Sequence, residues 1–235
     1  MEIIATHLSS DFDSFAGLFA AKKLYPKAEI VLPTSINQNV RKFFSLHEDL
    51  LPPVRDLREI DLKLIKKIII IDTKIALRLG FLKNIIDNKK TEIIIYDHHQ
   101  KTLEDISFGT IYSEKVGATT TILVEMIRKR KIDISPLEAT LFTLGIYEDT
   151  GSFTFPNTTY RDLISAAYLM KKGSNLFVVS KFLNPPLNEQ QHRLLEKLIS
   201  RAKKINVYEK KIIWSNAKTD DCGEGLSILT RKLAP

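Results

Sequence analysis

Apolar runs and helix-like segments alternate along the first two thirds of the chain. The strand candidates are isoleucine-rich and as short as buried strands: residues 3–6, 29–32, 67–72 and 92–96. Between them apolar residues recur at helical spacing, which predicts helices over residues 15–24, 39–46 and 76–87. This alternation predicts an α/β fold, a mostly parallel sheet with helices on both faces.

Clear helix start signals follow in the second half. Gly117 opens a long helical segment that continues through Ile127. Ser135-Pro136-Leu137-Glu138 combines an N-cap serine, a first-turn proline and a capping-box glutamate. Thr159-Tyr-Arg-Asp162 predicts another capped helix, which Gly173 would end. We therefore expect three further helices packed on the sheet.

The composition changes near Asn184-Pro-Pro-Leu187. Residues 1–186 are predicted to form the first domain, and residues 187–204 a charged linker helix. Residues 205–235 would begin a truncated or minimal second α/β module, with a hairpin over 205–214 and a helix over 225–233. One strand pair and one helix are little structure for an independent domain.

Acidic and histidine side chains close the apolar runs. His7, Asp11 and Asp13 follow the first apolar run, and Asp72 follows the isoleucine run 68–71. Asp97, His98 and His99 close the next strand, and Glu148 and Asp149 follow the apolar run 141–147. Because ligands of open α/β sheets bind beyond the carboxyl ends of the strands, we expect these strand and helix ends to converge on one site.

Carboxylates and imidazoles are suitable ligands for Mn, Zn or Mg. Asp11 and Asp13 would point to different sides of their turn and so serve two neighbouring ions. Asp72 would bridge both. Counting donors gives one group of three and one of four that share Asp72: His7, Asp11 and Asp72; Asp13, Asp72, His98 and Asp149.

Two such ions, about 3.5–4 Å apart and bridged by a hydroxide, are a recurrent arrangement for in-line attack on phosphorus. His99 would then hydrogen-bond a phosphate oxygen or protonate the leaving oxygen. Asp97 would orient a neighbouring imidazole. The helix start at Gly117 and Thr119 can also bind a substrate phosphate.

Each element also has a structural interpretation. The Asp11-Phe-Asp13-Ser14 segment can simply cap a helix, and Asp72-Thr73 can simply start a turn. His47 and His192 are interpreted as structural, and Cys222 as a passive thiol. The joint occurrence of the clusters at successive element ends favours the metal site.

Charge, cysteine content and hydropathy narrow the class of protein to which the chain can belong. The formal net charge is +7, with basic clusters at 128–131 and 197–211, which suits a polyanionic substrate or simply a solvated surface. A single cysteine excludes an internal disulfide framework. No apolar run is long enough to span a bilayer. The expectation is a cytoplasmic protein without a membrane partner.

The ordered clusters His7-x3-Asp11-x-Asp13, Asp72, Asp97-His98-His99 and Glu148-Asp149-Thr150 resemble the four motifs of the DHH phosphoesterase superfamily. This group includes RecJ-type exonucleases, oligoribonucleases that also dephosphorylate phosphoadenosine phosphate, cyclic-dinucleotide phosphodiesterases, exopolyphosphatases and family II pyrophosphatases. The resemblance implies a parallel α/β domain with two Mn²⁺ ions, a linker helix and a smaller associated domain. Mg²⁺ or Co²⁺ would also suit these ligands.

A narrower resemblance comes from Asn39-Val-Arg-Lys-Phe43, Gly117-Ala-Thr-Thr-Thr121, Glu138-Ala-Thr-Leu141 and Gly145-Ile-Tyr-Glu-Asp-Thr-Gly-Ser152. These segments are similar to the DHH module that precedes a tRNA nucleotidyltransferase or poly(A) polymerase domain in some bacterial proteins. The chain departs from the wider family in having no Gly-Gly-His-type substrate-binding segment, only Gly223 and Gly225 near its end.

The main hypothesis is a Mn-dependent phosphoesterase acting on nucleotides or short single-stranded oligonucleotides. One alternative is a nucleotide-binding or RNA-binding regulatory module, with tRNA or an RNA 3′ end as partner. Another is a pyrophosphatase or exopolyphosphatase, and a third is an α/β domain with a purely structural metal. The sequence also allows the protein to form a dimer.

Overall fold

The computed structural model describes residues 1–87, 91–208, 210–218, 229–230 and 233. They belong to two units, residues 1–183 and 184–235. The division falls close to the predicted boundary after residue 186. The first unit contains all the predicted site residues.

A six-stranded parallel sheet forms the centre of the first unit, with the strand order β3-β2-β1-β4-β5-β6. Its strands are β1 Glu2–Thr6, β2 Glu29–Leu32, β3 Val54–Asp56, β4 Lys67–Ile71, β5 Glu92–Asp97 and β6 Thr110–Ser113. The isoleucines of β4 from Ile68 to Ile71 are fully buried, as a strand covered on both faces requires. The predicted fold class and the four predicted strands are confirmed.

The two edge strands, β3 and β6, were not predicted. Strand β3 has only three residues and none of them is fully buried, and all four residues of β6 are exposed. Neither segment therefore has the continuous apolar run that marks the central strands.

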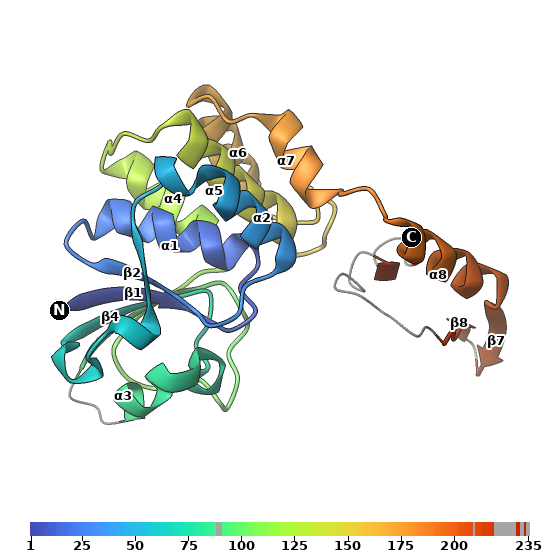
Figure 1. Cartoon of the computed structure of the whole chain (residues 1–235), viewed down its shortest axis with the longest axis horizontal. Coiled ribbons are helices and arrows are strands. Elements are labelled where there is room, and N and C mark those ends of the chain that lie inside the picture. The colour runs from blue at the N-terminus through green and yellow to red at the C-terminus, as the bar shows by residue number, and fades with distance from the viewer. Residues whose placement is uncertain (88–90, 209, 219–228, 231–232, 234–235) are drawn as a thin grey trace. The chain divides into compact units, whose positions relative to one another are not determined.

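Helices cover one face of the sheet more fully than the other. The α-helices of this unit are α1 Phe12–Leu24, α2 Gln38–His47, α3 Lys83–Asp87, α4 Thr119–Lys129, α5 Pro136–Asp149, α6 Tyr160–Lys171 and α7 Leu176–Leu183. Helices α1, α4 and α5 lie on one side of the sheet and α3 on the other (Figure 1). Each side has its own apolar core cluster, so the predicted two covered faces are confirmed.

The expected helix over 76–87 is interrupted. Residues Ala76–Leu82 form a 3₁₀ segment, and a separate α3 follows. Gly80 lies within the 3₁₀ segment at φ 59° and ψ −127°, a conformation that no helix contains. The periodicity was correct, but the backbone turns at the glycine. The other short 3₁₀ helices are Glu48–Leu50, Leu57–Glu59 and Leu62–Leu64.

Helices α1 and α5 pack against each other at Gly145. A Cβ atom there would lie 2.8 Å from Thr120 Oγ1 and 3.0 Å from the Ala16 side chain. Only glycine permits this approach without a shift of the neighbours. As a result the carboxyl end of α5, with Glu148, reaches the amino end of α1, where its carboxylate accepts a 2.6 Å hydrogen bond from Phe12 N.

The second unit contains α8 Glu189–Ser200 and an antiparallel hairpin of β7 Lys203–Val207 and β8 Lys210–Trp214. The predicted hairpin is confirmed. The predicted helix end at residue 204 is wrong, because α8 ends at Ser200 and Lys203 already belongs to β7. Cys222, Gly223, Gly225 and most of the expected 225–233 helix lie outside the described residues.

The order of the sheet determines where a site can form. The chain runs from β1 outward through β2 to β3, and from β4 outward through β5 to β6. The direction therefore reverses between β1 and β4, and the crevice beyond their carboxyl ends is the expected ligand position. In the part of the chain that the structure describes, no helix is long and apolar enough to cross a membrane.

Candidate metal centre

The predicted donors meet beyond the carboxyl ends of β1, β4 and β5. The structure forms one group from His7, Asp11 and Asp72, and another from Asp13, Asp72, His98 and Asp149. Within each group one ligand atom per residue lies within 4.8 Å of the others. These are the groups expected from donor counting. That they bind metal stays a prediction.

Asp72 is the residue common to both groups. Its Oδ2 lies 3.4 Å from His7 Nε2, and its Oδ1 lies 3.6 Å from His98 Nε2. The two oxygens of one buried carboxylate thus face opposite groups. Asp72 directly follows β4 and has a left-handed backbone conformation, φ 62°. Aspartate tolerates this conformation better than most residues, and such strain is concentrated at functional sites.

The backbone fixes the orientation of both histidines. His7 Nδ1 donates to its neighbour's carbonyl oxygen, Leu8 O, at 2.7 Å, and His98 Nδ1 donates to Val116 O at 3.2 Å. Because carbonyl oxygens only accept, a neutral ring then presents the lone pair of Nε2 to the centre. This is the usual arrangement of metal-binding histidines.

Asp11 and Asp13 both lie at the amino end of α1 but are held by different partners. Asp11 is the N-cap, and its Oδ1 accepts hydrogen bonds from Ser14 N at 3.1 Å and Ser14 Oγ at 2.9 Å. Asp13 is fully buried and accepts from Thr119 N at 2.7 Å and Thr120 N at 2.9 Å. The capping interpretation of this segment is therefore correct for Asp11, and capping does not remove Asp11 from the donor group.

The structure gives Gly117 and Thr119 a role different from the expected phosphate binding. Gly117 N donates to both carboxylate oxygens of Asp162, at 2.9 and 3.1 Å. Thr119 N is bonded to Asp13, and Thr119 Oγ1 donates to Asp72 Oδ1 at 2.7 Å. The helix start does bind anions, but they are the protein's own carboxylates.

Burial and mutual repulsion control ionisation in the larger group. Burial, together with the Asp72 and Asp149 charges, raises the pKa of Asp13 well above its usual range. Burial also raises the pKa of Asp149, to about 6, despite the nearby His98. Burial opposes protonation of His98, but the carboxylates of Asp149 and Asp13 outweigh it and raise the pKa of His98 to about 10.

These observations fit a pair of divalent cations. Three carboxylates and one imidazole converge within a few ångströms, and the buried His98 Nε2 lies 3.1 Å from Asp149 Oδ2 without a well-aligned hydrogen bond. A cation in each group would neutralise the carboxylates, and one of the two would bind the lone pair of this nitrogen.

His99 lies at the rim of the centre, with its side chain 47% exposed. Its Nδ1 donates to Asp97 Oδ1 at 2.6 Å, so Asp97 orients the imidazole, as the sequence suggested. That hydrogen bond raises the pKa of His99. Burial opposes ionisation of Asp97, but His99 and Lys74 together lower the pKa of Asp97 to about 2.

Sequence reasoning missed two buried charged residues that support the centre. Lys74 Nζ lies 2.9 Å from Asp97 Oδ2 and also donates to the backbone oxygen of His99. Asp162 connects the α4 start to its own capping box by accepting from Thr159 N at 2.7 Å. A lysine two residues after a strand-end aspartate was a usable signal for the first. For Asp162 the sequence indicated only a helix cap and gave no sign of a contact with the start of α4.

The remaining predicted structural residues lie outside the two donor groups. His47 Nδ1 hydrogen-bonds Phe43 O at 2.8 Å, and the two rings stack. His192 lies on the exposed α8. Neither belongs to a group of metal-type donors in the described part of the chain.

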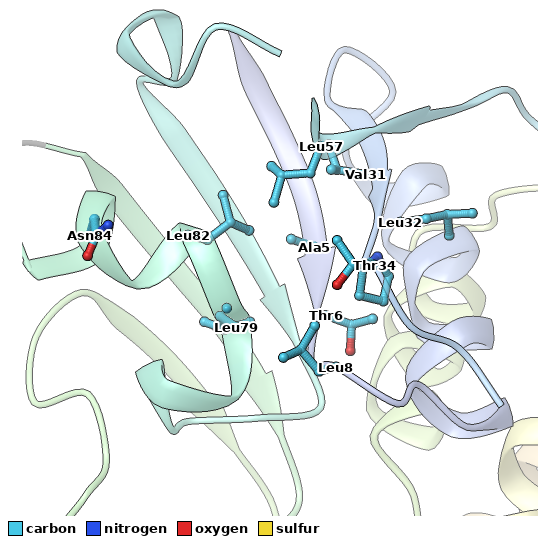
Figure 2. A pocket seen from close by; sticks show the side chains of 12 residues that line it. Ala5, Thr6, Leu8, Val31, Leu32, Thr34, Leu57, Leu79, Leu82 and Asn84 are labelled. Atoms are coloured by element: carbon cyan, nitrogen blue, oxygen red, sulfur yellow. The ribbon is translucent and has the colours of Figure 1, made fainter. Parts of the chain in front are cut away.

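A separate apolar cavity of about 390 Å³ lies on the α3 side of the sheet (Figure 2). Leucines from several segments point into it, among them Leu8, Leu57, Leu79 and Leu82. It contains none of the metal-type donors described above.

Known proteins resemble this chain over most of its length. Residues 2–146 match the DHH family, N-terminal domain. An A-adding tRNA nucleotidyltransferase of Geobacter sulfurreducens is 33% identical over 233 residues, covering 99% of this chain and 26% of that protein. The bifunctional oligoribonuclease and PAP phosphatase NrnA of Mycoplasma genitalium is 27% identical over 187 residues, 77% of this chain and 56% of that protein.

The fold is shared with a solved exopolyphosphatase-related protein of Bacteroides fragilis. The TM-score is 0.70 with 20% sequence identity, over 88% of this chain and 62% of that one. The present chain spans about a quarter of the length of the A-adding tRNA nucleotidyltransferases that it matches.

Proposed function

Because this chain belongs to the DHH family, we propose that it is a phosphoesterase that depends on two divalent cations, Mn²⁺ above all, and acts on nucleotides or short single-stranded oligonucleotides. One observation carries the proposal: two groups of hard donors share a single carboxylate, and the two oxygens of Asp72 face opposite groups. This is the ligand pattern of a two-metal site.

The two groups divide the binding of the cations. His7, Asp11 and Asp72 would hold one ion, and Asp13, Asp72, His98 and Asp149 the other. When bound, the ions supply positive charge for the phosphate oxygens and lower the pKa of a coordinated water. With three or four protein ligands, each ion would keep open coordination positions for phosphate oxygens and for this water. The carbonyls of Leu8 and Val116 keep the two imidazoles in the metal-binding tautomer.

His99 is placed to act on the substrate. Asp97 occupies its Nδ1, so the free Nε2 is the atom that would donate to a phosphate oxygen or to the leaving oxygen. Lys74 in turn neutralises Asp97 and holds the backbone of His99. The catalytic residues of the proposal are thus His99 and, by orienting it, Asp97.

The substrate class rests on the relatives. The bifunctional oligoribonuclease and PAP phosphatase acts, by its name, on short RNA and on a nucleotide. The A-adding enzymes act, by their name, on tRNA. RNA or a nucleotide is named as the substrate of these relatives, which favours a nucleotide or a short single-stranded oligonucleotide as the substrate of the present chain. The same centre in a pyrophosphatase or exopolyphosphatase would act on a phosphoanhydride, and pyrophosphate therefore belongs in the test.

The proposal is tested by turnover and metal binding of Asp72→Asn. The substitution keeps the side-chain shape and an αL-tolerant residue but removes the shared charge. We expect hydrolysis of phosphoadenosine phosphate, short oligonucleotides, cyclic dinucleotides or pyrophosphate with Mn²⁺ to fall at least about 100-fold. The rise in Tm on adding Mn²⁺ to chelator-treated protein should vanish as well.

Asp133→Asn is the matched control, because Asp133 is exposed and far from the donor groups in the sequence. It should keep both turnover and the Mn²⁺-induced rise in Tm. Full hydrolysis by a correctly folded Asp72→Asn protein would refute the two-metal mechanism.

A second candidate is a nucleotide-binding or RNA-binding regulatory module. It is favoured by the 33% identity to an A-adding tRNA nucleotidyltransferase across nearly the whole chain. In that case the centre would bind a nucleotide or an RNA 3′ end while another domain performs the chemistry. Metal-dependent binding of adenine nucleotides without multiple turnover would support this candidate, and multiple turnover would exclude it as the only function.

A further inference from the structure

A cavity of about 260 Å³, with several charged and polar residues in its lining, lies directly beside His99. It is enclosed by the segment that follows β4 and by the segment that follows the DHH motif. The lining residues used below are Lys74, Arg78, Asp97, His99, Thr102 and Asp105. Since Asp97 and His99 also belong to the candidate centre, the cavity opens next to the place where the phosphate would be attacked.

Backbone contacts hold the walls of this cavity together. Ile106 N donates to Lys74 O at 2.7 Å, and Ile75 forms an antiparallel bridge with Asp105. Arg78 is fixed at its backbone, because its nitrogen donates to Ile75 O at 3.1 Å and its oxygen accepts from Leu8 N at 2.9 Å. The cavity is therefore part of the folded structure and does not depend on one side chain.

The acidic groups of the lining are already bonded. Asp97 is paired with Lys74 at 2.9 Å and with His99. Asp105 accepts from Thr102 N at 3.1 Å and from Thr102 Oγ1 at 2.7 Å, so each of its oxygens has a donor. By contrast, Arg78 has neither an ion pair nor a side-chain hydrogen bond with any residue that the structure describes.

Arg78 therefore gives the cavity spare hydrogen-bond donors, whereas both carboxylates of the lining are already paired. A guanidinium offers five N–H donors in a planar fork that matches a phosphate. Arg78 is an exposed residue, so in the absence of a ligand its donors face water. A phosphate next to the attacked one would satisfy the fork.

We propose that this cavity is a subsite for a second phosphate of the substrate, adjacent to the scissile one, and that Arg78 determines the preference for substrates that carry it. The inference rests on the proposed phosphoesterase function and refines it. Substrates with two neighbouring phosphates, such as a terminally phosphorylated dinucleotide, would be preferred to those with one.

The test compares dinucleotides that differ only in a terminal phosphate: ApA, pApA and ApAp. With Mn²⁺ present, wild-type kcat/KM should be at least about tenfold higher for one of the phosphorylated forms than for ApA. In Arg78→Gln this ratio should fall about 10- to 100-fold, mainly through a higher KM for the phosphorylated form. Arg78→Lys should be intermediate, since it keeps the charge and loses the fork.

Lys101→Ala is the matched control, because it removes a nearby positive charge on an exposed residue that does not line the cavity. It should leave the ratio unchanged. Circular dichroism would verify the fold of each variant. An unchanged ratio in Arg78→Gln, or no wild-type preference at all, would overturn the subsite.

If the wild type hydrolyses neither these dinucleotides nor phosphoadenosine phosphate, cyclic dinucleotides or pyrophosphate, the proposed function fails independently of the subsite. Calorimetric titration with adenosine 3′,5′-bisphosphate in Mn²⁺ then decides the subsite alone. Binding about tenfold weaker to Arg78→Gln than to wild type would support it, and equal affinity would overturn it.

Discussion

At the scale of single residues, the centre depends on side chains that each have two partners. Asp72 faces both donor groups, and Asp11 caps a helix while belonging to one of them. Asp97 is the most constrained, because it is fully buried between Lys74 and His99. Such a buried carboxylate stabilises the fold only while it is ionised and paired.

The pairing of Asp97 predicts a pH-dependent stability. Its pKa of about 2 in the folded protein lies below the ordinary aspartate value. The stabilisation is therefore complete above about pH 5 and is lost as the pH falls toward 2. Asp97→Asn should lower the free energy of unfolding by about 2 kcal/mol at pH 7, since one pKa unit corresponds to about 1.4 kcal/mol. Near pH 2–3 the loss should be much smaller.

Urea denaturation of chelator-treated protein at pH 7 and pH 3 would measure this difference. Asp133→Asn removes an exposed aspartate of lowered pKa and should change the stability little at either pH. An equal loss for Asp97→Asn at both pH values would contradict the pairing argument.

At the scale of elements, the amino end of α4 holds two carboxylates of the centre in place; we call this contact the α4 clamp. Its first backbone amides bond Asp13, and Thr119 Oγ1 bonds Asp72. Both carboxylates benefit from the positive end of the helix dipole. Asp162, at the start of α6, holds this clamp in place through Gly117 N and through Thr121 Oγ1 at 2.6 Å.

Asp162→Asn should therefore weaken metal binding without touching a donor. The amide would place N–H groups against the donors of Gly117, Thr121 or Thr159, leaving buried groups unpaired. We expect a loss of about 2–4 kcal/mol in unfolding free energy and roughly 10- to 100-fold weaker Mn²⁺ binding by calorimetry.

Asn188→Ala provides the comparison, because Asn188 caps α8 in the second unit. This substitution should lower the free energy of unfolding by about 1 kcal/mol and leave the Mn²⁺ affinity unchanged. Equal Mn²⁺ affinity in Asp162→Asn and wild type would show that the α4 clamp does not position the donors.

At the scale of the whole molecule, the centre belongs to one unit. Every donor, both core clusters and the proposed phosphate subsite lie within residues 1–183. The second unit contributes an amphipathic helix and a hairpin with exposed strands.

Residues 1–183 expressed alone should therefore fold and bind Mn²⁺. We expect circular dichroism of a folded α/β domain and a Mn²⁺-induced rise in Tm equal to that of the full chain. The same domain carrying Asp72→Asn should show no such rise. A domain that fails to fold, or that folds without binding Mn²⁺, would mean that the second unit is required.

The sequence by itself determined the central strands, the main helices and the six donors. Continuous isoleucine runs can only be satisfied by strands buried on both faces, and parallel strands bring their carboxyl ends to one edge. The sequence did not predict the edge strands β3 and β6 or the helix break at Gly80. Short exposed strands and a single residue at which the backbone turns leave no periodic pattern of apolar residues.

Only the tertiary structure decided how the donors are held. The partners of Asp13, Asp97 and Gly117 come from segments distant in the chain, such as Thr119, Lys74 and Asp162. No local spacing records such contacts, since hydrogen bonds between distant segments depend on how helices and strands pack. For the same reason the sequence assigned the α4 start to a substrate phosphate, whereas the fold uses it to bind the protein's own carboxylates.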